Sequence, residues 1–124
     1  MATQMEVINW LWENVEDLQQ LSPTTFSFRK LVEDDRGQDV YFEVSESLVL
    51  ISSPFSHQGQ ISSDVALKMV ADNTALGMRK VGEFYALAHV VPIEDLDVSE
   101  IVVGIHLVGE SADELETLLG DDVF

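Results

Sequence analysis

The sequence predicts an α+β domain in which helices pack on one antiparallel sheet. Three observations lead to this class. Apolar residues recur at helical spacing near both ends of the chain, strand-like apolar runs lie between them, and a short helical run divides the strands into two groups. The expected order is α-β-β-β-α-β-β-α. A length of 124 residues suits a single domain over residues 1–124.

The first helix is expected over Gln4 to Leu21. Thr3 and Glu6 have the spacing of a capping box, in which the hydroxyl and the carboxylate satisfy N–H groups at the helix start. Ser22-Pro23 should stop the helix. The apolar residues that keep helical spacing are Ile8, Leu11, Trp12, Val15 and Leu18.

Three strands are expected next, as an antiparallel meander. Thr25 to Val32 forms the first strand, and residues 33–37 read as a turn. Val40 to Val44 alternates as a half-buried strand does. Leu48 to Ile51 is continuously apolar, which predicts a central strand.

The middle of the chain is expected to form a loop and a second helix. Ser, Pro, Gly and Gln dominate Ser52 to Gln60, which is typical of a loop. Ser62-Ser63-Asp64 is a good helix start, and the helix should end near Leu76-Gly77.

A hairpin is expected before the last helix. Met78 to Val81 and Phe84 to Val91 can pair around Gly82-Glu83, since Gly at the first central position suits a type II′ turn. A single long bent strand is the alternative interpretation.

The last segment, Val98 to Leu119, is predicted to be one long helix. Ile101 to Val108 is β-branched enough to form a strand, but Asp97 has cap spacing and the apolar residues keep helical phase over five turns. Gly104 and Gly109 cost such a helix about 1 kcal/mol each relative to Ala. They therefore indicate close packing within the domain or against a twin chain.

The charge of the chain limits its partners. Six basic and 23 acidic residues give a formal charge of -17, and no Lys or Arg follows Gly82. Nucleic acid and anionic membrane surfaces would be repelled. Solubility alone, or adaptation to a salty cytoplasm, is the other explanation of the acidity. We expect a cytoplasmic protein, since the sequence has no signal peptide pattern and no apolar run that could insert into a membrane.

No set of residues predicts catalysis, a metal site or a cofactor. The chain has no cysteine, and its histidines, His57, His89 and His106, lack metal-binding spacing. Ser27 begins an isolated SxxK pattern on an expected strand, which is weak as a nucleophile signature. The acidic pairs Asp34-Asp35 and Asp121-Asp122 read as solvated carboxylates, because no calcium-binding loop surrounds them.

Three aromatic residues are candidate contacts for a partner protein. Trp10 and Trp12 lie about 200° apart on a helix, so both cannot point into the core. Phe55 lies in the expected loop. A partly exposed aromatic that flanks the core is the ordinary interpretation, and an interface anchor is the functional one.

Two segments, Leu48 to Pro54 and Ala88 to Asp97, complete a family resemblance. Together with the element order, the small size and the acidity, they resemble the third strand and the strand–Leu-Pro-Leu-Glu-Asp-Leu–helix segment of class I type III secretion chaperones and the related YbjN-type proteins. The likeness spans nearly the whole chain. It departs from the family pattern between Gly77 and Phe84, where the strand and turn are compressed.

The resemblance implies a homodimer that holds an extended segment of another protein, without ATP and without catalysis. By analogy, Val65, Met69 and Val70 would lie in the dimer interface. The leading hypothesis is therefore a non-catalytic, chaperone-like binding protein. The alternatives are a YbjN-type regulatory or assembly factor and, from another class, a small ligand-binding domain or enzyme.

Overall fold

The computed structural model describes residues 3–32, 37–94 and 96–120, and it confirms the α+β class with helices on an antiparallel sheet. The six strands have the order β1-β2-β3-β4-β6-β5, and every neighbouring pair is antiparallel. The expected turn over residues 33–37 lies mostly outside the described residues. The elements are α1 (Gln4–Asn14), β1 (Gln19–Ser22), β2 (Thr25–Leu31), β3 (Gly37–Val44), β4 (Leu48–His57), α2 (Ser63–Asn73), β5 (Gly77–Val81), β6 (Phe84–Pro92) and α3 (Val98–Leu119).

The first helix is shorter than predicted, and its expected last part contains a strand instead. The Thr3 hydroxyl accepts from the Glu6 N–H as expected, but α1 ends at Asn14 and β1 follows. Glu13, Glu16 and Asp17 would place three carboxylates at the negative end of a longer helix, which is unfavourable. Asp17 instead adopts a left-handed backbone conformation, φ 56°, that turns the chain into β1.

The loop predicted over Ser52 to Gln60 is wrong for its first six residues, because β4 runs on to His57. Ser52, Ser53 and Pro54 pair with β6. On the opposite side β3 stops pairing at Ser52, so the missing N–H of Pro54 interrupts no ladder. The Ser53 hydroxyl donates to the Asp39 carbonyl at 2.6 Å and so replaces a backbone bond there.

The second helix starts as predicted, with Ser62 accepting from the Val65 N–H, and it ends at Asn73, three residues early. The hairpin prediction is confirmed, and the alternative of one bent strand is not: β5 and β6 pair through Val81 and Phe84, with Gly82 at φ 56°.

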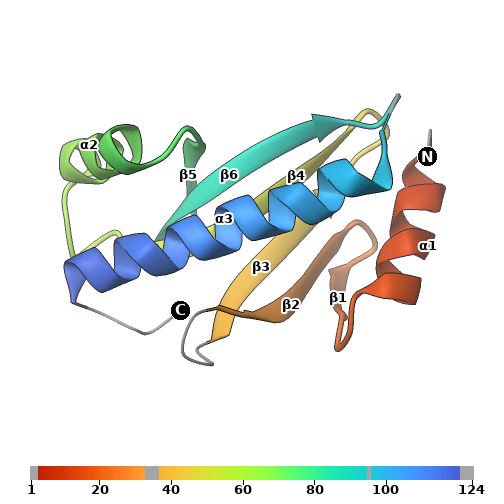
Figure 1. Cartoon of the computed structure of the whole chain (residues 1–124), viewed down its shortest axis with the longest axis horizontal. Helices are drawn as coiled ribbons and strands as arrows, with labels where there is room; N and C mark the ends of the chain where they lie inside the picture. Colours follow the sequence, from red (N-terminus) through yellow and green to blue (C-terminus); the bar gives the residue numbers. More distant parts are fainter. Residues whose placement is uncertain (1–2, 33–36, 95, 121–124) are drawn as a thin grey trace.

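The predicted long helix is confirmed, and α3 lies diagonally across one face of the sheet (Figure 1). The Asp97 side chain accepts from the Ser99 N–H at its start. Both glycines mark close packing within the domain. A Cβ on Gly104 would lie 2.7 Å from Ile51 Cδ1, and one on Gly109 would lie 2.8 Å from Lys30 Cδ.

The core has two parts under the two halves of α3. The larger part lies among α1, the sheet and the first turns of α3, and it includes Leu11, Phe42 and Ile101. The smaller part joins α2 to the last turns of α3 through Val70, Phe55 and other buried residues. In Figure 1, α1 and α2 lie at opposite ends of the sheet, and α3, β4 and β6 link the two parts because each contributes residues to both.

Candidate functional site

The N-terminal half of α3 exposes a row of apolar side chains. Val98, Val102, Val103 and Leu107 are 37% to 53% exposed, while Ile101 and Gly104 face the sheet and are buried. We call these four residues the α3 strip. A groove lies on each side of the helix: Val102 lines one, and Val103 and Leu107 line the other. The exposed residues Ser99, His106 and Glu110 lie on the helix face between them. Exposed apolar side chains beside a groove are characteristic of binding sites.

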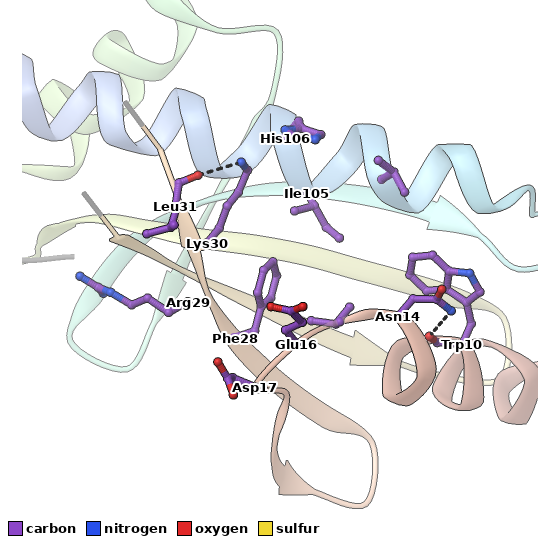
Figure 2. Close-up of a pocket in the computed structure, with 12 residues that line it drawn as sticks. Trp10, Asn14, Glu16, Asp17, Phe28, Arg29, Lys30, Leu31, Ile105 and His106 are labelled. Carbon is purple, nitrogen blue, oxygen red and sulfur yellow. Dashed lines mark hydrogen bonds between the residues drawn. The ribbon is translucent and has the colours of Figure 1, made fainter. Parts of the chain in front are cut away.

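The first groove has a volume of about 660 Å³ and lies among the end of α1, strand β2 and α3. Figure 2 shows Phe28 on β2 and Ile105 on α3 directed into the same space, with Trp10 and Asn14 at the α1 end. Phe28 stacks on Phe42 with ring centroids 5.7 Å apart, which fixes its orientation. The floor of this groove is therefore apolar and held by the core.

Two basic residues of β2 lie at the rim of this first groove. Lys30 lays its stem against Gly109 and its ammonium group donates to the Leu31 carbonyl at 3.2 Å. The Arg29 guanidinium donates to Asp39 at 2.9 Å and is directed away from the groove (Figure 2). Neither charge lies over the apolar floor.

The second groove has a volume of about 370 Å³ and lies on the other side of the strip, between α3 and the end of β6. Val103 and Leu107 of the strip form its helix side, and Glu100 lines its rim. Residues 89–92 of β6 form the opposite side. In Figure 1, β6 extends past β5 in this region, and among the described residues no strand flanks it there on the side away from β4.

The edge of β6 presents unpaired backbone groups to the second groove. The Pro54 carbonyl accepts from Gln38 of β3 at 2.7 Å, so Pro54 points its backbone toward β3 and not toward β6. Backbone direction alternates along a strand, so Ser52 and Leu50 also direct their backbone groups toward β3. Their partners on β6, Ala88 and Val90, therefore form no backbone hydrogen bonds with them. Val90 therefore directs its N–H and C=O outward.

Strand β5 does not cover these outward groups of Val90. Its pairing with β6 ends at Gly77↔Ala88, and no described residue bonds to the backbone of Val90. The Ile93 N–H donates to the Ser47 carbonyl, on the β4 side. Ile93 lies three residues after Val90, so alternation predicts the opposite backbone direction for it, as observed. The described part of β6 thus has a free edge from Val90 to Pro92.

The surroundings of the free edge are acidic. Glu94, Asp97 and Glu100 are exposed at the start of α3, and the sequence has no Lys or Arg after Gly82. Hydrogen bonds from the Ser99 N–H and hydroxyl hold the pKa of Asp97 below its ordinary value. The carboxylate at the helix start is therefore ionised at neutral pH.

The sheet face opposite α3 has a different character. Arg29 pairs with Asp39, and Arg79 lies 3.9 Å from Glu43, so its charges are balanced. Burial raises the pKa of Tyr41 on this face, and the nearby Asp39 charge raises it further. This face also carries buried apolar residues, among them Leu50 and Ala86, and has two hollows of about 210 and 150 Å³ beside Tyr41.

The predicted aromatic contacts fall in three different environments. Trp10 is half-buried in the wall of the first groove. Trp12 is 48% exposed and meets Phe26 edge-on at 5.9 Å, so one tryptophan does remain at the surface as predicted. Phe55 is fully buried and stacks with Tyr85. The prediction that Phe55 lies in a loop and could contact a partner is wrong, because Phe55 belongs to β4.

The residues predicted for a dimer interface lie on two sides of α2. Val65 is exposed and Met69 is half-buried, one turn apart on the helix. Val70 packs in the core with Ala66 and presents almost no surface. Leu67, which the sequence analysis did not single out, is 53% exposed.

Neither the α3 strip nor the β6 edge was among the contacts predicted from the sequence. The strip had a signal, because Val102, Val103 and Leu107 fall outside the helical phase that was assigned to the core. The free edge had none, since it depends on where β5 begins to pair.

The described residues show neither a metal-binding cluster nor a membrane-spanning helix. They contain no group of three or more His, Cys, Asp or Glu residues placed to hold a metal ion. Among the same residues, no helix has the length and apolar character needed to cross a membrane. His106 lies 3.7 Å from Glu110, one turn away. The acidic pairs Asp34-Asp35 and Asp121-Asp122, and Asp95 of the segment before α3, lie outside the described residues.

Searches against protein-family models, curated proteins and solved structures gave no match for this chain.

Proposed function

We propose that this protein is a non-catalytic, chaperone-like binding protein that shields an apolar segment of a partner protein. The observation that carries the proposal is the α3 strip, in which four apolar side chains are 37% to 53% exposed. Grooves of about 660 and 370 Å³ flank it, so the apolar surface continues on both sides. The resemblance to class I secretion chaperones and YbjN-type proteins supports the same class of function.

The strong negative charge fits this role. A protein with an exposed apolar surface would associate with itself unless repulsion opposed it, and a charge of -17 per chain supplies such repulsion. Close to the strip in sequence, Asp97, Glu100 and Glu110 add negative charge beside its apolar side chains.

Photo-crosslinking in the native host tests the proposal. A photoreactive residue at Val103 should capture a protein other than a second copy of this chain in a discrete band, and one at Leu67 should give only the crosslinked homodimer, although both positions are 53% exposed. The changes Val102→Ser and Val103→Ser together should abolish capture of that partner by the tagged protein, whereas Val65→Ser and Leu67→Ser should retain it. Equal capture from both positions, or retention in the α3 variant, would contradict the assignment.

The homodimer is part of the proposal and involves a different surface. On α2, Val65 and Leu67 are exposed, and Lys68 directly follows Leu67 in sequence. Arg79 and Lys80 of β5 add positive charge at the same end of the sheet. Two chains would carry 2 × -17 = -34, so contact is least unfavourable where these cations lie.

Light scattering over a range of salt concentrations tests the dimer. We expect a dimer whose population increases with salt, because screening weakens the repulsion between the chains. Leu67→Ser with Val65→Ser should shift the population to monomer. A monomer of the wild-type chain at every salt concentration would exclude the dimer.

A further inference from the structure

We propose that the sheet face opposite α3 binds a small aromatic carboxylate in the two hollows beside Tyr41. This inference goes beyond the proposed function and does not depend on it, because the hollows and the α3 strip lie on opposite sides of the sheet. Three features support it: an apolar hollow bounded by aromatic rings, an adjoining hollow with a net positive charge, and an arginine that its present partner holds weakly.

The first hollow, of about 210 Å³, has an apolar lining. Pro54 and Ala86, which pair across β4 and β6, lie between the rings of Tyr41 and Phe84. The Phe84 ring packs on His57 with ring centroids 4.8 Å apart, which holds that wall in place. None of the residues that line this hollow is charged. A flat apolar group that can pack against the two rings is therefore the favoured occupant.

The second hollow, of about 150 Å³, adjoins the first, since Tyr41 and Ser52 are among the residues that line both. Its charged lining residues are Arg79, Lys80 and Glu43, so its net charge is +1. The first groove beside α3 has two carboxylates and two cations in its lining, and the second groove has one carboxylate. In a chain of charge -17, an anion is thus favoured at this hollow over either groove. A ligand that spans both hollows would be apolar at one end and negative at the other.

Arg79 reaches over the sheet to its partner. Strands β6 and β4 separate β5 from β3, so the side chains of Arg79 and Glu43 together bridge about 14 Å. The Arg79 Nη1 lies 3.9 Å from the Glu43 Oε2, which is longer than a hydrogen bond, and the two side chains are 47% and 60% exposed. Such an ion pair contributes little to stability. Arg79 can therefore turn to the carboxylate of a ligand, which a guanidinium group holds by two parallel hydrogen bonds.

Tyr41 supplies a second hydrogen-bond donor beside both hollows. Its hydroxyl makes no hydrogen bond to a described residue. Burial of the ring raises the pKa of Tyr41, and the nearby Asp39 charge raises it further. The phenol is therefore protonated at neutral pH and can donate to a carboxylate. Glu43 opposes binding, because its own carboxylate lines the second hollow and competes for Arg79.

Three simple compounds test the ligand class without knowledge of the native ligand. Phenylacetate is the probe, phenylacetamide is its neutral isostere, and acetate lacks the ring. Each is titrated into the isotope-labelled full chain near physiological salt, and binding is followed by NMR chemical shifts. Phenylacetate should shift the backbone amides of Ser52 and Ala86 and the Arg79 Nε–H in a saturable way. Phenylacetamide and acetate should each bind about tenfold more weakly, because one lacks the charge and the other the apolar contact.

Variants of the protein complete the test. Arg79→Gln should weaken phenylacetate binding about tenfold, and Glu43→Gln should strengthen it by a few fold. Arg29→Gln is the matched control, because Arg29 lies on the same face and pairs with Asp39 but lines neither hollow. The affinity of this control should stay within about twofold of wild type. Ala86→Leu should fill the first hollow and abolish binding, and a dispersed NMR spectrum should show that each variant is folded.

The outcomes separate this inference from the proposed function. Equal affinity for phenylacetate and phenylacetamide, or for wild type and Arg79→Gln, would overturn the carboxylate site. Shifts confined to α3, or no saturable shift at millimolar phenylacetate, would overturn it as well. Broadening of the Ser52 and Ala86 signals that grows with protein concentration would show that a second copy covers this face, and this too would overturn the proposal. The proposed function would stand in each case if Val103 still captured a partner.

Discussion

In the N-terminal half of α3, residues 98–107, apolar side chains occupy the exposed positions, whereas in the C-terminal half, residues 108–119, Asp113 and Glu116 are buried. Burial preferences alone favour buried apolar side chains in the first half and exposed carboxylates in the second. The C-terminal half is covered by α2, and of its apolar residues only Leu118 is largely exposed. This difference supports the proposal that the first half contacts another molecule, whereas the second half packs within the domain.

The largest expected effect that sharpens this comparison is a pair of leucine truncations on α3. Leu115→Ala should lower the free energy of unfolding by about 2 to 5 kcal/mol, because Leu115 is fully buried between α2 and the sheet. Leu107→Ala, in the exposed half, should cost less than about 1 kcal/mol. Denaturant unfolding measures both. Similar costs at the two positions would mean that Leu107 is a core residue.

The two helix glycines give the next effect. Gly104→Val should destabilise by about 1 to 3 kcal/mol, because its side chain would overlap the buried Ile51. Gly109→Ala should lie within about 1 kcal/mol of wild type, since only the flexible Lys30 stem must move and the helix gains propensity. Gly59→Ala, with no atom within 4 Å, controls for the loss of glycine itself. A neutral Gly104→Val would show that α3 is not pressed onto β4.

The smallest expected effect is the pH dependence of the helix cap at Asp97. Its pKa is lowered in the folded state, so its contribution to stability is present above the unfolded pKa of about 3.9 and is lost as pH falls through the lower folded value. Asp97→Asn keeps a capping oxygen but does not titrate. The difference in Tm between wild type and Asp97→Asn should therefore shrink as the pH falls below about 4. A constant difference down to pH 2 would exclude this role.

The parts of the fold that the sequence predicted are those in which local signals and tertiary packing agree. The helix over Val98 to Leu119 has a cap, a long phase and one buried side, and it was predicted against a competing β-branched strand. The hairpin around Gly82 has its turn residue in place. In both cases the local sequence signal that forms the helix or hairpin agrees with the way that element packs in the domain.

The errors arose where composition and packing conflict. Ser52 to Ser56 is loop-like in composition, yet β6 supplies a partner strand and side-chain hydroxyls replace missing backbone bonds. Val15 keeps helical phase, but the carboxylates beyond Asn14 oppose further helix. Of the candidate contacts, Trp10 lies at a groove and Trp12 at the surface, while the free edge depends on strand lengths that no local pattern specifies.

The positions of the two tryptophans provide an intrinsic optical signal. Trp12 lies in contact with solvent and should be readily quenched by acrylamide, whereas Trp10 lies in the groove wall beside Phe28. An occupant of that groove would exclude water from the Trp10 indole and shift its emission to the blue. Replacing Trp12 with phenylalanine would leave one fluorophore in the described structure, and its spectrum would report occupancy without any attached dye.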